Sequence, residues 1–197
     1  MEKQIKKLQK TKIKNTIKKR IKQFENQKDW FSELCFCLLT ANWKAKESIE
    51  LQKALCKDGF CNWTKLKLAK FLKSKGHRFW PQRAERICLA RKYKNIKQIL
   101  RKQENPRKWL VKNIKGLGMK ESSHFLRNVG YKNYAILDRH ILSLLAENKL
   151  IKIPKTLTPK KYLEIENIVN TVAKNIKMTP AELDLYMFYI KTGMVLK

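Results

Sequence analysis

The amino-acid sequence predicts an all-α protein, and two observations support this. Apolar residues recur at spacings of three and four along nearly all of the 197 residues, while alternation of period two is scarce. Helix-start signals also recur: Thr179 precedes Pro180 and stands three residues before Glu182, as in a capping box with proline at the first helical position. Thr158 and Pro159 form a second start of the same kind.

Taken in chain order, the apolar stripes and the residues that end them place the helices. Gly59, Gly76 and Gly130 fall where helix C-caps are expected, because glycine readily adopts the left-handed conformation that ends many helices. The segment 150–157, which contains Pro154, is the clearest linker. With boundaries good to about two to four residues, the expected helices are 10–25, 29–41, 44–57, 64–74, 81–93, 95–103, 106–114, 119–129, 136–148, 159–176 and 180–192.

The charge balance favours a polyanionic partner. Lysine and arginine number 46 against 16 acidic residues, a formal net charge of +30, and so basic a surface attracts nucleic acid. A lysine-rich proteome would also raise this count. The N-terminal isoleucine stripe is too sparse for a membrane-surface helix. No apolar run of 18 residues and no signal peptide is present, so we expect a cytoplasmic, nucleoid-associated protein.

The cysteines favour reduced, buried thiols over a metal site. Their number, five, is odd, no export signal accompanies them, and their spacing does not match a zinc finger. We expect no metal and no organic cofactor. The residues concerned are Cys35, Cys37, Cys56, Cys61 and Cys88.

The most informative motif is a glycine turn between two expected helices. The apolar helix 106–114 runs into Gly116 and Gly118, which flank one leucine, and the next helix begins at once. Two glycines allow the turn to press its N–H groups onto a phosphate at a helix start, where the helix dipole is positive. Lys120 lies two residues past the second glycine, and an Ile-Leu-Asp-Arg-His-Ile segment follows at 136–141.

These motifs resemble the helix-hairpin-helix DNA glycosylases of the endonuclease III superfamily, and most closely the type-two 8-oxoguanine DNA glycosylase/lyases. The resemblance covers most of 29–197 and is thinnest over the lysine-rich start. It implies two helical lobes, 29–133 with the hairpin and 1–28 plus 134–197, with DNA in the cleft between them. Since no cysteine follows Cys88, the iron–sulfur cluster of many endonuclease III relatives cannot exist here. The residues that carry the resemblance are Ile114-Lys115-Gly116-Leu117-Gly118-Met119-Lys120, Leu137-Asp138-Arg139-His140-Ile141, the segment 34–42 and Gly130-Tyr131.

Lys120 and Asp138 are the expected catalytic residues. A glycosylase/lyase needs an amine that attacks C1′ of the deoxyribose, and an ordinary lysine is protonated at neutral pH, so a helix start, nearby cations and burial must favour the neutral amine. One solvated lysine among many is the alternative for Lys120. The resemblance gives Asp138 the role of stabilising positive charge on the sugar and assisting proton transfer. A plain N-cap is its alternative, and one aspartate can do both.

Other residues are candidates for DNA contacts. Asn42 stands where relatives place a polar residue that fills the gap left by the extruded base, or it is the C-cap of its helix. Arg139 is a phosphate or structural contact, and His140 is a DNA contact or a core residue. The complete set of expected DNA-binding residues is Lys115, Gly116, Gly118, Asn42, Arg83, Arg139 and His140.

The base pocket is the least determined part of the site. Phe79 is a candidate face of the pocket or a core residue, within a segment that mixes basic and aromatic side chains. Asp184 is an acceptor for the guanine edge or a surface charge, and Phe188 is a stacking face or core. Lys197 closes the pocket in this interpretation. Discrimination against guanine needs an acceptor near N7–H of 8-oxoguanine, which sequence does not reveal.

The sequence therefore predicts a bifunctional DNA glycosylase with apurinic/apyrimidinic lyase activity, which removes 8-oxoguanine from double-stranded DNA in base excision repair through a lysine Schiff base. We expect it to act as a monomer on duplex DNA with 8-oxoguanine or abasic sites. The alternatives are an oxidised-pyrimidine glycosylase of the endonuclease III type, a monofunctional glycosylase, and a non-catalytic helix-hairpin-helix module that only binds DNA.

Overall fold

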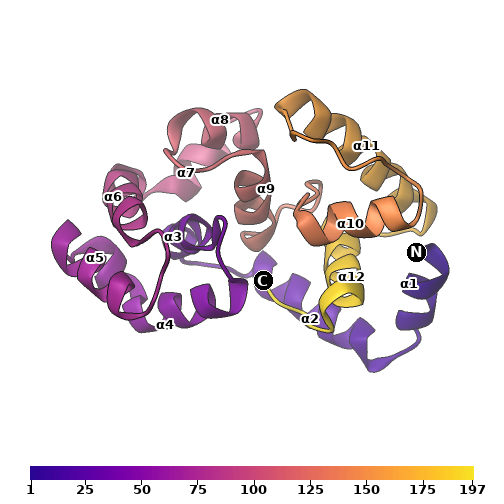
Figure 1. Ribbon diagram of the computed structural model, residues 1–197, viewed down its shortest axis with the longest axis horizontal. Coiled ribbons are helices and arrows are strands. Elements are labelled where there is room, and N and C mark those ends of the chain that lie inside the picture. The colour runs from indigo at the N-terminus through magenta and orange to yellow at the C-terminus, as the bar shows by residue number, and fades with distance from the viewer. The chain divides into compact units, whose positions relative to one another are not determined.

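The protein is built from α-helices, one 3-10 turn and no strands, which confirms the all-α prediction. A computed structural model describes residues 1–197 (Figure 1). The elements are α1 (Glu2–Leu8), α2 (Lys12–Glu25), α3 (Trp30–Thr40), α4 (Ala45–Cys61), α5 (Lys65–Ser74), α6 (Trp80–Ala90), η1 (Arg91–Tyr93), α7 (Ile96–Arg101), α8 (Pro106–Asn113), α9 (Met119–Asn128), α10 (Arg139–Glu147), α11 (Pro159–Asn175) and α12 (Pro180–Thr192).

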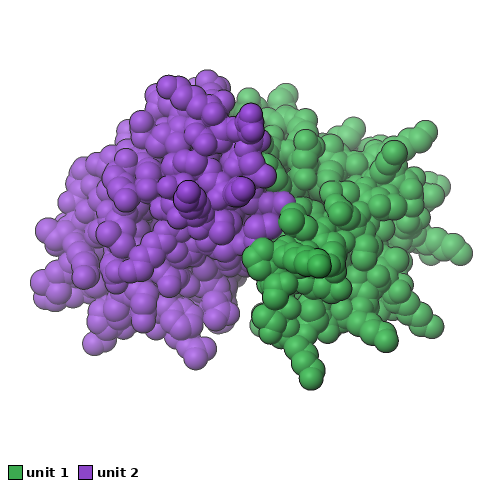
Figure 2. All heavy atoms as spheres, turned by 90° about the horizontal axis from the view of Figure 1, so that it is seen from above, with its two compact units in different colours: residues 1–27, 126–197 green, residues 28–125 purple.

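The chain divides into two compact units, shown in different colours in Figure 2. Unit 2 is Lys28–Phe125, and unit 1 joins Met1–Gln27 to Leu126–Lys197. The second boundary falls inside α9, whereas the predicted lobe boundary lies at 133/134. The last turn of α9 goes with unit 1 because Arg127 lies over the Phe24 ring, 5.1 Å from its centroid.

Unit 2 is organised around α3, which is buried along nearly its whole length. Its sequence is apolar on every side, as expected of a helix enclosed by others. The helix packs against α4, α6 and α7. Asp29 caps its start, because the carboxylate accepts a hydrogen bond from the Ser32 N–H at 2.9 Å. Because α3 is enclosed by these helices, the position of its C-terminal end at Thr40 is fixed.

Unit 1 is organised around α12 in the same way. This helix packs against α1, α2, α10 and α11, and it starts with the expected capping box between Thr179 and Glu182. Among its buried residues is one carboxylate, Asp184, which forms an ion pair with Arg127. Their side chains are 4% and 5% exposed, so unit 1 contains a buried charge pair.

Helix ends at glycine follow the prediction at two of three positions. Gly76 and Gly130 have φ of +72° and +99°, and the N–H groups of His77 and Tyr131 return to the carbonyls of Leu72 and Leu126. These are Schellman motifs. The segment 151–157 forms no helix, as expected of a linker.

The third glycine was placed wrongly, and one helix was not predicted. Gly59 lies inside α4, which continues to Cys61 because Phe60 is fully buried. A Cβ on Gly59 would lie 2.8 Å from Cδ2 of Leu55, so a small residue is needed there. The expected helix 10–25 is α2, which Thr11 caps, whereas α1 precedes it at Glu2–Leu8 and buries Ile5.

The thiols are all free, and the prediction that they are buried holds only in part. Cys35 and Cys37 in α3 are buried, whereas Cys56 is exposed. Cys56 has φ of +50° at a kink in α4, which turns that residue outward. None of the helices is both long and apolar enough to span a bilayer.

Candidate active site and nucleic-acid interface

The hairpin between α8 and α9 is fixed by two buried side chains and one glycine. Ile114 and Leu117 are buried on either side of the turn. Between them Gly116 has φ of +100°, and a Cβ there would lie 2.5 Å from Cδ of Arg86. The conformation therefore favours glycine at position 116, and a larger residue would also displace the Arg86 side chain.

Gly118 differs from Gly116 in both respects. Its φ is not positive, and an added Cβ would meet only Oε2 of Glu121, at the ordinary distance of 3.5 Å. Gly118 is exposed and directly precedes the first turn of α9. The first N–H groups of a helix have no partner within it, so the absence of a side chain leaves these donors open to an approaching anion.

Lys120 lies in the first turn of α9 and is partly shielded. Its side chain is 26% exposed, and its Nζ is 3.5 Å from Oε1 of Glu121. Lys115, in the turn itself, is 64% exposed, and its Nζ is 2.9 Å from Oε1 of Glu85. Both lysines of the hairpin therefore have a carboxylate partner, and they differ in exposure, since Lys120 is partly buried and Lys115 is largely exposed.

A pocket of about 370 Å³ in unit 2 gathers several of the predicted residues. Asn42, Phe79, Arg83 and Gly116 all line it, together with Glu121, the neighbour of Lys120. The remaining lining residues are Ala41, Gln82 and Arg86. The pocket joins the end of α3, the start of α6 and the glycine turn, three segments that are distant in sequence.

Asn42 stands directly beyond the end of α3 with its side chain exposed. Its φ of +59° is the left-handed conformation that asparagine adopts more readily than most residues. The structure is compatible with both interpretations of this residue, because Asn42 follows the C-cap residue Ala41 in a helix-ending conformation and is also an exposed residue that lines the pocket.

Arg83 is buried and serves the end of α3. Its Nη2 donates a hydrogen bond to the carbonyl of Ala41. Burial, together with the positive charge of Arg86, lowers the pKa of Arg83 to about 10, which leaves it protonated at neutral pH. This contact gives Arg83 a structural role, and a DNA contact by it stays a prediction.

In unit 1, Asp138 caps α10. Its Oδ1 accepts hydrogen bonds from the N–H groups of His140 and Ile141, both at 2.9 Å. Oδ2 takes no part in the cap. The alternative of an N-cap is thus realised, and one carboxylate oxygen remains available for other contacts.

The segment before Asp138 is held by two residues that the sequence analysis did not single out. The buried hydroxyl of Tyr162 donates to the carbonyl of Ala135 at 2.7 Å and accepts from the Leu137 N–H at 3.3 Å. Glu166 accepts from the Ala135 N–H at 3.0 Å. A signal was present, since Tyr162 and Glu166 recur at the i, i+4 spacing on one face of α11.

His140 lies beside Phe188 in the same unit. Their ring centroids are 5.7 Å apart with an interplanar angle of 83°, an edge-to-face contact. Both side chains are half-buried, while Arg139 is exposed. A predicted DNA contact and a predicted base-pocket residue are therefore neighbours.

Asp184 is buried, so the alternative of a surface charge on α12 is wrong. Its carboxylate is engaged by Arg127, and the same guanidinium reaches Oδ1 of Asn128 at 3.1 Å. The pair favours a structural role, and recognition of a base by Asp184 stays a prediction. Lys197 is half-buried at the chain end.

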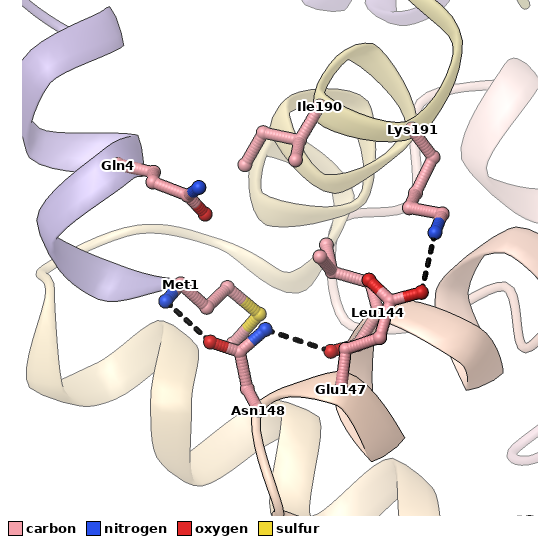
Figure 3. A pocket seen from close by; sticks show the side chains of 7 residues that line it. All are labelled: Met1, Gln4, Leu144, Glu147, Asn148, Ile190 and Lys191. Carbon is pink, nitrogen blue, oxygen red and sulfur yellow. Dashed lines mark hydrogen bonds and ion pairs between the residues drawn. The ribbon is translucent and has the colours of Figure 1, made fainter.

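A second pocket, of about 390 Å³, lies in unit 1 near the C-terminal end of α10 (Figure 3). Its polar groups pair with one another: Nζ of Lys191 is 2.6 Å from Oε1 of Glu147, and the Met1 amine is 2.6 Å from Oδ1 of Asn148. None of the predicted site residues lines it. It therefore offers no support for the expected chemistry.

An all-α chain with a glycine hairpin, a lysine in the helix that follows it and a capping aspartate downstream fits the class of helix-hairpin-helix DNA glycosylases. Comparison with known proteins narrows this class. The family described as 8-oxoguanine DNA glycosylase matches residues 12–178. The chain belongs to this family.

Relatives and a solved structure agree with that membership. A protein of Methanocaldococcus jannaschii named 8-oxoguanine DNA glycosylase/AP lyase is 51% identical, over 99% of this chain and 98% of the relative. A protein of Aquifex aeolicus with the same name is 47% identical, over 85% and 78%. The crystal structure of the M. jannaschii enzyme with a 15mer DNA containing 8-oxoguanine has a TM-score of 0.96 and 50% identity, and covers 100% of this chain and 99% of that one.

Proposed function

We propose that this protein excises 8-oxoguanine from duplex DNA and then cleaves the strand, as a bifunctional DNA glycosylase and AP lyase. The observation that carries the proposal is the position of Lys120, in the first turn of the helix that follows the glycine hairpin. Family membership supplies the substrate and the two activities.

In this proposal Lys120 is the nucleophile. Its Nζ forms a bond to C1′ of the deoxyribose while the bond from C1′ to the base breaks, and the damaged base leaves. Opening of the sugar ring then gives a Schiff base between Nζ and C1′. Loss of a proton from C2′ expels the 3′ phosphate and cuts the strand, and water releases Lys120.

Asp138 is the proposed partner. Since Oδ1 is held by two N–H groups at the start of α10, the carboxylate has a fixed orientation. Oδ2 can then stabilise positive charge developing on the sugar and pass a proton to or from the amine. Tyr162 and Glu166 support this by fixing the backbone that leads to Asp138.

The hairpin is the proposed phosphate contact. Gly118 leaves the N-terminal N–H groups of α9 accessible, and a backbone phosphate bound there would fix the position of the strand relative to Lys120. Asn42 is the proposed residue that occupies the space left by the extruded base, and Phe79 is the proposed face of the base pocket, because both line the pocket beside the turn. His140, Arg139 and Lys115 remain proposed DNA contacts.

The proposal also includes the oligomeric state, the location of the protein and two further contacts of the base. Lys120 and Asp138 belong to one chain, so we expect a monomer to be sufficient for activity. We also expect the protein to be found with the nucleoid DNA, in the cytoplasm. Phe188 and Lys197 are proposed contacts of the extruded base.

The experiment that tests the function is a comparison of substrates. Duplexes containing 8-oxoguanine, guanine, an oxidised pyrimidine or an abasic site are incubated with the protein, and released bases and cut strands are quantified separately. We expect release of 8-oxoguanine and cutting at both the 8-oxoguanine and the abasic site. Preferred release of the oxidised pyrimidine, or binding without release of any base, would contradict the proposal.

A further inference from the structure

His77 occupies a position fixed by the end of α5. Gly76 adopts the left-handed conformation after the helix, and the His77 N–H returns to the Leu72 carbonyl at 3.0 Å. This Schellman motif turns the chain sharply and places the imidazole in the interior of unit 2, where His77 is only 1% exposed.

The hydrogen bonds of the ring define its tautomer. The Phe79 N–H donates to Nδ1 at 3.2 Å, so Nδ1 is an acceptor. Nε2 therefore carries the hydrogen and donates to the carbonyl of Leu39, 3.0 Å away. Burial lowers the pKa of His77, and the positive charge of Arg83 lowers it further, which agrees with a neutral ring.

The ring also contacts the residue that follows Asn42. Trp43 stacks on His77 with ring centroids 4.7 Å apart and an angle of 24° between the planes. The backbone N–H of Trp43 donates a hydrogen bond to the Thr40 carbonyl at 2.9 Å, which fixes the turn containing Asn42. His77 thus holds the end of α3 from both sides of Asn42, through Leu39 and through Trp43.

One buried side chain therefore connects the two segments that carry Asn42 and Phe79. The link to Asn42 runs through the end of α3, and the link to Phe79 is a direct bond to its backbone. Both of these residues line the pocket beside the glycine turn, whereas His77 does not.

We propose that His77 is a positioning residue that holds Asn42 and Phe79 at a fixed spacing, so that Asn42 fills the gap in the duplex while Phe79 contacts the extruded base. The inference rests on the proposed function, in which Asn42 and Phe79 have these two roles. Small displacements of positioned groups can cost about a hundredfold in rate. His77 acts through these residues and touches no DNA itself.

Two substitutions of His77 each remove one of the two hydrogen bonds of its ring. In His77→Gln the side-chain amide reaches the position of Nε2 and can still donate to Leu39, but the acceptor for Phe79 is lost. In His77→Asn the amide oxygen lies near the position of Nδ1 and can still accept from Phe79, but the donor to Leu39 is lost. Each is combined with Asn42→Ala and with Phe79→Ala.

The measurement is the single-turnover rate of 8-oxoguanine excision, compared with cleavage at a preformed abasic site, where no base has to be extruded. We expect both His77 variants to slow excision by about ten- to a hundredfold and to cleave the abasic site near the wild-type rate. Because residues in one network are non-additive, Phe79→Ala should add little to His77→Gln, and Asn42→Ala should add little to His77→Asn.

Three results would overturn the inference, and they are distinguishable. If Asn42→Ala and Phe79→Ala leave excision unchanged, the roles of Asn42 and Phe79 in the proposed function fail and the inference fails with them. If those two variants slow excision while both His77 variants retain the full rate, the inference alone fails. Equal loss of excision and abasic-site cleavage in folded His77 variants would show a general structural role instead.

Discussion

At the scale of single residues, Asp138 shows how one side chain can serve both stability and chemistry. Its Oδ1 caps α10, and Oδ2 remains outside the cap. Asp138→Asn keeps a good cap, so stability should change little, whereas loss of the carboxylate should slow excision by about 10²–10⁴-fold. Asp138→Ser is the matched control, since serine caps equally well. Rates per folded molecule, measured beside thermal unfolding, decide the point. Full activity in both variants would leave Asp138 as a cap only.

His77 also gives a prediction for the pH dependence of stability. Because burial lowers its pKa in the folded state, the unfolded chain binds more protons between that value and the ordinary value of 6.5. The contribution of His77 is therefore fully present above about pH 6.5 and is lost as the pH falls below it. Urea unfolding of the wild type and of His77→Gln should converge in stability between pH 7.5 and pH 5.5. Parallel curves would show that His77 does not titrate in this way.

Individual residues could be predicted from the sequence where a local motif defines them. The glycine turn located Lys120, and an apolar helix preceded by an aspartate located the cap at Asp138. Asp184 could not be placed, because its partner Arg127 is 57 positions away and α12 is buried around most of its circumference, so it has no polar face to compare with. The roles of Tyr162 and His77 could not be predicted for the same reason, because each side chain bonds a backbone carbonyl of a distant segment.

At the scale of elements, the two glycines of the hairpin have different roles. Gly116→Ala should destabilise the protein by about 1–3 kcal/mol, because alanine is strained at its positive φ. Gly118→Ala should leave stability unchanged or raise it by about 0.4–1 kcal/mol, and should weaken binding to damaged and undamaged duplex alike. Thermal unfolding and fluorescence anisotropy measure the two effects. Unchanged DNA affinity in Gly118→Ala would remove this turn from the phosphate contact.

Helices with a clear stripe and a clear cap were predicted to within a few residues, and the exceptions have physical causes. Lysines outnumber apolar residues within the short helix α1 itself, and its one fully buried side chain, Ile5, gives little periodicity. The kink at Cys56 carries no glycine or proline signal in the sequence. Short helices and kinks were therefore harder to predict from the sequence than the long helices.

At the scale of the whole molecule, the net charge of +30 should dominate non-specific binding. Many lysines are exposed on α1, α2 and the turn between them, including Lys3, Lys6, Lys7, Lys10, Lys12, Lys14, Lys18, Lys19 and Lys22. If about six to ten phosphates are contacted, affinity for undamaged duplex should fall by about 10³–10⁵-fold between about 50 and 200 mM salt. A salt titration checks this. A nearly flat plot of log affinity against log salt would show that the lysines are merely solvated.

The central claim is that Lys120 forms a covalent bond with the sugar. The direct measurement is borohydride trapping on a duplex containing 8-oxoguanine, followed by mass spectrometry of the adducted peptide, for the wild type, Lys120→Gln and the exposed control Lys112→Gln. Lys120 contacts only its neighbour Glu121 through its ammonium, so Lys120→Gln should fold and still bind DNA. We expect the adduct on Lys120 in the wild type and in Lys112→Gln, and no adduct in Lys120→Gln. A trapped complex in Lys120→Gln, or an adduct on another residue of the wild type, would contradict the account.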